Sequence, residues 1–358
     1  MKIAVAMSGG VDSSVAALIL KNEGHDVMGI TMDLWGKDVQ VPEGVLSINS
    51  AVKDAAEVAR KLGIEHKVVD LSREFSDEVK RYFASEYARG RTPNPCVVCN
   101  RRIKFGHLWD AARKLGAGSI STGHYARITG EKGHPTLTEA VDKKRDQSYF
   151  LYDIPRNMLM NIVFPLGSLS KDKVRRMAFE EGLPAAFRED SQDICFVNTD
   201  DDYKGFLLRL GVKAFEPGDI VDISGKNIGR HNGIASYTVG QRQGLGVAAA
   251  EPLYVLKIDP ENNRIIVGHR RSTMKSRIKI GGLNWLIDDT EISFPLELEA
   301  RIRYRSSKAK AILREDRGGD KALLEFLNGQ FAPTPGQSAV FYRGENVLGG
   351  GWIEEVID

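Results

Sequence analysis

Ala6-Met7-Ser8-Gly9-Gly10-Val11-Asp12-Ser13-Ser14 lies near the start of the chain, between the apolar runs 3–6 and 15–20. An apolar run, a pair of glycines among hydroxyls and a helix-forming run together predict a strand, a tight turn and a helix. Such a turn directs several backbone N–H groups at one point, and the helix dipole adds partial positive charge there. We therefore predict a phosphate-binding loop, to which the serine hydroxyls add donors.

The loop lacks the lysine that a Walker loop carries after its glycines. Its pattern, SGGxDSS, instead resembles the PP-loop of ATP pyrophosphatases, which cleave ATP into AMP and pyrophosphate. The resemblance implies ATP as the ligand, together with Mg²⁺. The alternative is a serine-glycine turn without a function, which is disfavoured because all these residue types occur in register.

At 358 residues the chain is longer than one average domain, so two or three domains are expected. Its hydrophobic content of 42% and charged content of 27% are typical of a globular protein. No apolar run approaches the ~20 residues of a membrane span, and the phosphate-loop pattern stands where a signal-peptide core would lie. We therefore expect a cytoplasmic protein with no membrane partner. A net charge of +2 does not by itself indicate nucleic-acid binding.

Strand-like and helix-like segments alternate through the first third of the chain. After the first helix we expect strands at 25–32, 64–71 and 119–122, and helices at 51–62, 74–87 and 103–115. This alternation predicts an α/β domain with a parallel sheet and helices on both faces. Ligands of such sheets bind at the carboxyl ends of the strands. Ser8, Met32 and Gly123 follow three of these strands, so one nucleotide pocket is expected there.

The pattern changes near Glu216, where a Pro-Gly pair opens a region of short alternating apolar runs separated by glycines. Such runs predict antiparallel β structure. A further β set lies between about 278 and 357 and includes strands at 296–304, 321–327 and 337–342. Periodicity alone does not decide whether these two regions form one domain or two. We expect a PP-loop catalytic domain at 1–210, a small β-rich central domain at 211–275 and a C-terminal, antiparallel, barrel-like β domain at 276–358.

The second informative stretch is RTPNPCVVCN at 91–100, in which Cys96 and Cys99 are three residues apart near an expected helix start. The helix dipole and the basic residues at 101, 102 and 104 would favour a thiolate there. A single CxxC is ambiguous: a redox pair, half a zinc site, an iron–sulfur site shared with Cys195 or a sulfur-handling nucleophile. Structural zinc is disfavoured because it takes four ligands and the chain has three cysteines. By itself, Cys195 would be interpreted as a buried structural cysteine.

Basic residues gather in three places. Arg301, Arg303 and Arg305 alternate, so in a strand their side chains would share one face, with Tyr304 opposite. Lysines follow at 308 and 310, and further clusters lie at 101–104 and 173–176. These groups could contact RNA phosphates, but a solvated charged face explains the run at 301–310 equally well.

Eight motifs occur in order along the chain: SGGVDSS, GRTPNPCVVCNRRIKF, STGHYAR, RDQSYFLY, EDSQDICF, YTVGQRQGLG, RIRYR, and TPGQSAVFY followed by LGGGWI. The set closely resembles the bacterial tRNA-specific 2-thiouridylase (MnmA) family over essentially the whole chain, from Ser8 to Trp352. That family adds sulfur to carbon 2 of the wobble uridine in tRNAs for Lys, Glu and Gln. ATP adenylates the carbon-2 oxygen with release of pyrophosphate, and a sulfur nucleophile then displaces AMP, because the urea-like carbonyl needs a leaving group.

The resemblance also implies roles for particular residues of this chain. The ATP-binding positions are Ala6, Met7, Ser8, Gly9, Gly10, Val11, Asp12, Ser13, Met32 and Gly123. The target base is expected to meet Asn94, Pro95 and Cys96. Cys99 matches the nucleophile, and Cys195 matches the cysteine that carries a persulfide. Positions of tRNA contact are His124, Arg145, Asp146, Gln147, Arg303, Tyr304 and Gln337. Without the resemblance, Asp146 and Gln147 would be interpreted as a cap and turn before Ser148, and His124 as a structural histidine.

Cys96 is a departure, because well-studied relatives often have aspartate at that position, and a cysteine cannot reproduce a carboxylate's charge. Two hypotheses follow. In the first, which we favour, Cys195 bears a persulfide, Cys99 reduces it or forms a disulfide, and Cys96 is an accessory. In the second, Cys96, Cys99 and Cys195 hold a [4Fe–4S] cluster whose fourth iron carries hydrosulfide. Either one needs a donor, such as a sulfur-relay protein or a cysteine-desulfurase system.

Two other functional classes would also use a phosphate loop of this kind. One is a PP-loop enzyme that adenylates a small molecule, such as an amidotransferase or an argininosuccinate-type synthetase; the three cysteines, the basic β region and the lack of a glutaminase-like segment disfavour it. The other is a nucleotide-sensing RNA-binding protein, which would need no thiol beside an intact phosphate loop.

Overall fold

A parallel sheet organises the N-terminal part of the computed structural model, which describes residues 1–35, 48–131, 133–187, 194–197, 203–316 and 321–357. The five strands run in the order β3-β2-β1-β4-β7, and all neighbouring pairs are parallel. Their bounds are β1 (Lys2–Ala6), β2 (Asp26–Asp33), β3 (Glu65–Asp70), β4 (Ser119–Thr122) and β7 (Ile162–Val163). The predicted parallel sheet is confirmed.

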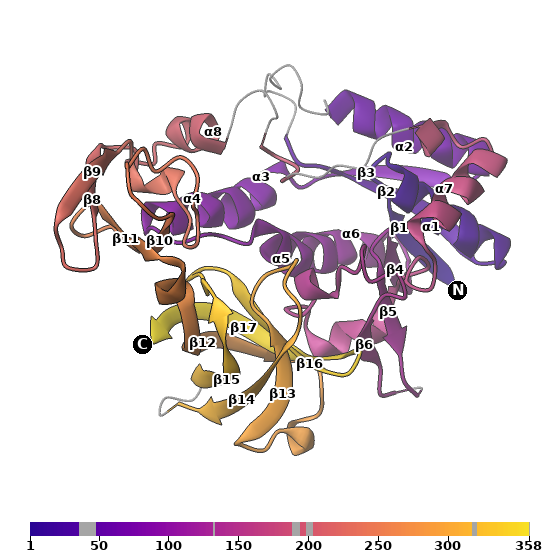
Figure 1. Cartoon of the computed structure of the whole chain (residues 1–358). Coiled ribbons are helices and arrows are strands. Elements are labelled where there is room, and N and C mark those ends of the chain that lie inside the picture. Colours follow the sequence, from indigo (N-terminus) through magenta and orange to yellow (C-terminus); the bar gives the residue numbers. More distant parts are fainter. Residues whose placement is uncertain (36–47, 132, 188–193, 198–202, 317–320, 358) are drawn as a thin grey trace.

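Helices cover both faces of this sheet (Figure 1). Side chains of the central strand alternate between two cores: Ile3 and Val5 pack with residues of α1, α2 and α7, whereas Ala4 packs with residues of α4 and α6. This is the two-sided burial that a parallel sheet requires. The helices are α1 (Val11–Asn22), α2 (Ile48–Leu62), α3 (Ser72–Phe75), α4 (Arg81–Ala88), α5 (Pro95–Val98), α6 (Leu108–Lys114), α7 (Lys171–Glu180) and α8 (Tyr203–Arg209).

Two of the expected helices are parts of longer ones. α3 continues through a π-helical stretch at Ser76–Lys80 into α4, and α5 continues through a second one at Cys99–His107 into α6. The helix expected at 103–115 therefore begins eight residues earlier, at Pro95. Because π-helical stretches are rare and concentrate at functional sites, the one that begins at Cys99 marks this helix for closer attention.

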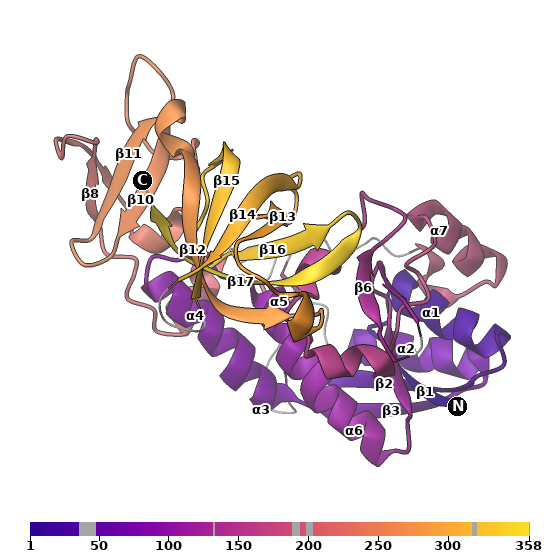
Figure 2. The same ribbon diagram turned by 90° about the horizontal axis from the view of Figure 1, so that it is seen from below.

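The remainder of the chain forms two β structures (Figure 2). A four-stranded sheet has the order β10-β11-β8-β9, with β8 (Gly218–Val221), β9 (Asn227–His231), β10 (Leu253–Asp259) and β11 (Arg264–His269). The second sheet has the order β12-β15-β14-β13-β16-β17, and pairing of β12 with β17 closes it into an antiparallel barrel. Its strands are β12 (Met274–Trp285), β13 (Leu296–Arg301), β14 (Ala309–Glu315), β15 (Lys321–Phe331), β16 (Ser338–Arg343) and β17 (Asn346–Ile357). The predicted barrel-like fold is confirmed.

A hairpin from the N-terminal part joins the barrel. It consists of β5 (Ala126–Thr129) and β6 (Thr136–Glu139), and β6 pairs with β17 beside the barrel. Tyr149, Tyr152 and Tyr342 are all fully buried in one core that the barrel shares with the parallel sheet. The barrel is thus packed firmly against the N-terminal part, and no helix in the described ranges is both long and apolar enough to cross a membrane.

One expected strand is wrong in its extent. The segment predicted as a strand at 296–304 leaves the sheet after Arg301, and residues 302–308 form a turn. Arg301, Arg303 and Arg305 therefore do not share one strand face. The bend follows from local hydrogen bonding, since the backbone N–H and the hydroxyl of Ser306 both donate to the Arg303 carbonyl.

Candidate active site

The turn between β1 and α1 leaves backbone donors exposed at one point. Gly9 has a φ of +75°, and a Cβ there would lie 2.9 Å from the Ala51 carbonyl oxygen. The Ser13 hydroxyl accepts from the Ser8 N–H at 3.2 Å and donates to the Gly10 carbonyl at 3.2 Å, which fixes the shape of the turn. Because the first N–H groups of a helix have no partner within it, those of α1 are available to an anion. The predicted strand, turn and helix are confirmed.

Three strand ends meet at this turn. Ala6 is opposite Ile30 on one side and Thr122 on the other, so Ser8, Met32 and Gly123 lie at the same edge of the sheet, as predicted. Gly123 touches the turn directly, since a Cβ at this position would lie 2.7 Å from the Ser13 nitrogen. No other residue fits there without moving the loop.

The predicted phosphate loop contains no lysine of its own, but a lysine of α7 contacts it. Lys171 is 6% exposed, and its Nζ donates to both carboxylate oxygens of Asp12, at 2.8 and 2.9 Å. The Tyr125 hydroxyl donates to Asp12 Oδ1 at 2.8 Å. Sequence reasoning missed Lys171, because it is 159 residues from its partner and only the neighbouring cluster at 173–176 drew attention. The ammonium is thus a buried cation beside the loop, where it is paired with the Asp12 carboxylate.

The three cysteines gather around the start of the α5 helix. Pro95 is in the first turn, where its missing N–H costs nothing. Cys99 is buried, whereas Cys96 and Cys195 keep exposed surface. Phe196 anchors Cys195, because its ring meets those of Phe75 and Phe83 edge to face at 5.5 and 5.3 Å. Cys96 and Cys99 both influence the pKa of Cys195, which indicates that the structure brings these three thiols together.

Two residues connect the cysteines to the phosphate loop. His124 follows Gly123, and its Nε2 accepts a hydrogen bond from Lys104 Nζ at 3.3 Å. Its Nδ1–H therefore faces the Thr122 hydroxyl, 2.7 Å away. Burial, and then Lys104, hold the pKa of His124 well below its ordinary value, so the ring is neutral. Lys104 lies on the helix of the cysteines and also lowers the pKa of each of them.

The thiols are nevertheless protonated at neutral pH, so the expectation of a thiolate is wrong for this structure. Burial raises the pKa of Cys99 to about 11, and the surrounding protein also raises the pKa of Cys195, although that residue keeps exposed surface; both effects outweigh that of Lys104. The other two expected cations are engaged elsewhere: Arg101 donates to Asp153 at 2.7 Å, and Arg102 Nε lies 3.8 Å from a carboxylate oxygen of Glu78.

The barrel holds the segment that precedes the cysteines. The side-chain amide of Gln337 donates to the carbonyls of Thr92 and Pro93, at 3.1 and 3.0 Å, and the Thr92 N–H donates to the Pro335 carbonyl at 3.0 Å. Asn94, which follows, is 5% exposed. Gln337 therefore lies beside the expected target-base positions, where it fixes their backbone.

The other residues expected to contact tRNA lie where the barrel meets the N-terminal part. Arg303 Nη2 donates to the Val239 and Ala332 carbonyls, at 3.0 and 2.6 Å. The Tyr304 ring packs on that of Phe150 at 4.5 Å. Arg145 is exposed, whereas Asp146 is buried. The side-chain oxygen of Gln147 accepts a hydrogen bond from the Tyr125 N–H at 2.9 Å.

Among the residues that the structure describes, no three His, Cys, Asp or Glu side chains are placed to hold a metal ion. Cys96, Cys99 and Cys195 are all within the described ranges. A [4Fe–4S] cluster would bind each of these three thiolates to a different iron, so this finding concerns sites for a single ion and does not test the cluster.

Three family profiles match successive parts of the chain. Residues 1–199 match a tRNA methyl transferase HUP domain, residues 204–269 a tRNA methyl transferase PRC-barrel domain and residues 275–353 an aminomethyltransferase beta-barrel domain. The descriptions refer to methyl transfer, whereas the full-length relatives are named for sulfur transfer.

Those relatives extend over nearly the whole chain. A protein of Syntrophotalea carbinolica named tRNA-specific 2-thiouridylase MnmA is 46% identical and covers 98% of this chain and 98% of its own length. One of Caldanaerobacter subterraneus subsp. tengcongensis, named tRNA-specific 2-thiouridylase MnmA 1, is 45% identical over 99% of this chain and 98% of its own. A solved 4-thiouridine synthetase–RNA complex with bound ATP is 18% identical, with a TM-score of 0.38, over 58% of this chain and 49% of that one.

We expect Lys171→Met to weaken nucleotide binding about tenfold to a hundredfold, because a charge-assisted hydrogen bond contributes roughly 1.5–3 kcal/mol. Calorimetric titration with a non-hydrolysable ATP analogue measures the effect. The matched control is Lys173→Met, which removes an exposed lysine from the same helix and should leave the affinity unchanged. Equal affinities for the two variants would contradict a role of Lys171 at the phosphates.

We expect alkylation of Cys99 to accelerate with pH up to about 11, because burial raises the pKa of its thiol to that value and only the thiolate reacts. Iodoacetamide labelling of the Cys96→Ser/Cys195→Ser double variant measures this, since the chain has three cysteines. Adding Lys104→Met removes a cation that lowers this pKa, so it should slow labelling at every pH below the midpoint. A midpoint at or below the ordinary cysteine value of about 8.5 would be inconsistent with the buried thiol.

Proposed function

The chain belongs to the family of tRNA-specific 2-thiouridylases, and on this premise we propose that it converts the wobble uridine of tRNAs for Lys, Glu and Gln into 2-thiouridine at the expense of ATP. Relatives that are 45–46% identical over 98–99% of the chain support this most directly. The site supports it independently, because contacts through Gly123, His124 and Lys104 connect a phosphate-binding loop to a group of thiols.

The first half of the reaction activates the uridine. The carbon-2 oxygen attacks the α-phosphorus of ATP, the bond to the β-phosphate oxygen breaks, and pyrophosphate leaves. The N–H groups at the start of α1 and the Lys171 ammonium are the groups that would bind phosphate oxygens. Mg²⁺ accompanies ATP, since it is a hard ion that binds phosphate oxygens and water. The adenylated oxygen is then a good leaving group.

The second half transfers sulfur. A persulfide on Cys195 attacks carbon 2 through its terminal sulfur, and AMP leaves with the former carbon-2 oxygen. Cys99 then attacks the Cys195 sulfur, which breaks the sulfur–sulfur bond, releases the 2-thiouridine and forms a Cys99–Cys195 disulfide. An external thiol reductant supplies two electrons for the next turnover, and a sulfur-relay protein or a cysteine-desulfurase system supplies the next persulfide sulfur. Lys104 is the cation placed to stabilise the developing thiolates.

The persulfide route is preferred to the cluster route because it needs only two thiols that can meet. The cluster route would use the same three thiols, so the choice is made by the cysteine variants and the iron assay described below. Cys96 remains an accessory in this scheme. Its pKa is raised by burial, so at neutral pH it does not replace the charge of a carboxylate.

We expect the purified protein to release pyrophosphate from ATP when unmodified tRNA for Lys, Glu or Gln is added, and to form 2-thiouridine when a persulfide donor is also present. Mass spectrometry of digested tRNA and a pyrophosphate assay measure these products. A tRNA transcript whose wobble uridine is replaced by cytidine is the control. Pyrophosphate release that depends on a small carboxylic acid and ignores tRNA would instead support a small-molecule synthetase.

Cysteine variants in the same assays separate the two sulfur routes. Cys99→Ser should abolish 2-thiouridine formation while tRNA binding stays within about twofold, because one sulfur–oxygen replacement leaves the surface unchanged. Cys96→Ser should retain measurable product, and active protein prepared without oxygen should contain no stoichiometric iron. Stoichiometric iron that is lost together with activity in Cys96→Ser would contradict the persulfide route.

A further inference from the structure

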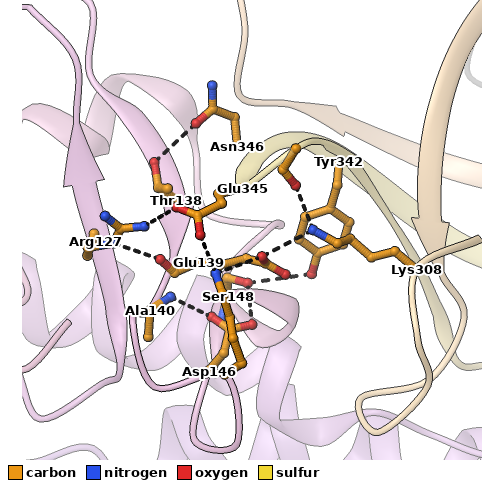
Figure 3. Close-up of polar contacts among 12 residues, drawn as sticks. Arg127, Thr138, Glu139, Ala140, Asp146, Ser148, Lys308, Tyr342, Glu345 and Asn346 are labelled. Carbon is orange, nitrogen blue, oxygen red and sulfur yellow. Dashed lines mark hydrogen bonds and ion pairs between the residues drawn. The ribbon is translucent and has the colours of Figure 1, made fainter. Parts of the chain in front are cut away.

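Figure 3 shows Glu139 beside Lys308 of the barrel. Glu139 forms ion pairs with three cations, one from its own segment and two from the barrel. It is 1% exposed. Arg301 Nη2 donates to its Oε1 at 2.8 Å, and Lys143 and Lys308 each donate to its Oε2 at 3.1 Å. Glu139 and Lys143 belong to the N-terminal part, whereas Arg301 and Lys308 belong to the barrel. A single buried carboxylate therefore joins the two.

Arg301 connects this centre to Asp146. Its Nη1 donates to Asp146 Oδ2 at 3.2 Å. Asp146 accepts further hydrogen bonds from the Ala140 N–H at 2.9 Å and from the Ser148 N–H and hydroxyl at 3.3 and 2.9 Å. Both carboxylate oxygens of Asp146 are thus used by the protein itself, and the residue is 2% exposed. A buried carboxylate in this state is poorly placed to contact an RNA.

The two ends of this connection lie in the segments proposed to contact tRNA. Asp146 belongs to the loop 140–147, which carries the exposed Arg145, and Arg301 stands at the start of the turn 302–308, which carries Tyr304. Fully hydrogen-bonded buried ion pairs hold their partners in one geometry, and loss of one partner leaves an uncompensated charge. The Arg301–Asp146 pair therefore fixes the position of one segment relative to the other.

We propose that Glu139, Arg301 and Asp146 are positioning residues for tRNA. They hold the loop 140–147 and the turn 302–308 in a single arrangement before tRNA arrives, and Asp146 acts through Arg301 without touching the RNA. The inference rests on the proposed function, because it concerns how that substrate is bound. The inference implies that the affinity for tRNA depends on side chains buried beneath the surface that binds the tRNA.

Two substitutions distinguish a positioning role from a purely electrostatic effect on tRNA binding. Asp146→Asn makes a basic surface more positive, so electrostatics alone predicts tighter tRNA binding. Arg301→Lys leaves the charge unchanged but cannot reach two carboxylates with a planar fork, so electrostatics alone predicts no change. Positioning predicts weaker binding in both variants.

The experiment measures tRNA-stimulated pyrophosphate release by the full-length protein. We expect Arg301→Lys and Asp146→Asn each to raise KM for tRNA about tenfold, while kcat and KM for ATP stay within twofold. Their double variant should be little worse than either single one, because both remove the same link. The matched control, Glu297→Gln, removes an exposed carboxylate from the same strand as Arg301 and should not raise KM for tRNA.

Each result bears on the inference. An unchanged or lower KM for tRNA in either folded variant would overturn it, as would a loss confined to kcat, which would indicate a smaller folded fraction. If Asp146→Asn does not fold, the KM for tRNA of the charge-conserving variant Arg301→Lys still tests the inference. A wild-type protein that tRNA does not stimulate would overturn the proposed function together with this inference, whereas an active wild type with unaffected variants would overturn the inference alone.

Discussion

The site depends on one close contact, between the end of β4 and the backbone of the phosphate loop. Gly123 lies so near Ser13 that a Cβ would be 2.7 Å from its nitrogen. The next residue, His124, is thereby brought to the loop and accepts a hydrogen bond from Lys104 on the helix of the cysteines. Gln337 of the barrel holds the segment that precedes this helix. The contact between Gly123 and Ser13 therefore connects the predicted phosphate loop to the helix that carries Cys96 and Cys99.

The surroundings of the cysteine thiols set their protonation state before substrate binds. The thiols of Cys99 and Cys195 are neutral because the surrounding protein raises the pKa of both, that of Cys99 to about 11. A neutral thiol is a weak nucleophile and is less readily oxidised than a thiolate. Lys104, which lowers the pKa of both, is the fixed charge that favours deprotonation.

The sequence was sufficient where local pattern and structure coincide. The strand, glycine turn and helix around Ser8 were predicted because apolar periodicity and turn chemistry are local properties, and the family resemblance extended this to the fold. The sequence was insufficient where distant segments meet. Lys171 and Arg301 find their carboxylate partners 159 and 155–162 residues away, and no spacing rule connects them. The expected thiolate failed for the same reason, because helix-dipole arguments are local while burial of Cys99 is a property of the whole fold.

The central claim is that the loop and the cysteines act on one uridine, whose carbon-2 oxygen ATP converts into a leaving group. The most direct measurement uses an anticodon stem-loop RNA that carries ¹⁸O at carbon 2 of the wobble uridine, incubated with ATP and a persulfide donor. Mass spectrometry should find one ¹⁸O in each AMP released with 2-thiouridine, because the former carbonyl oxygen departs on the phosphate. Formation of 2-thiouridine with unlabelled AMP would contradict the claim.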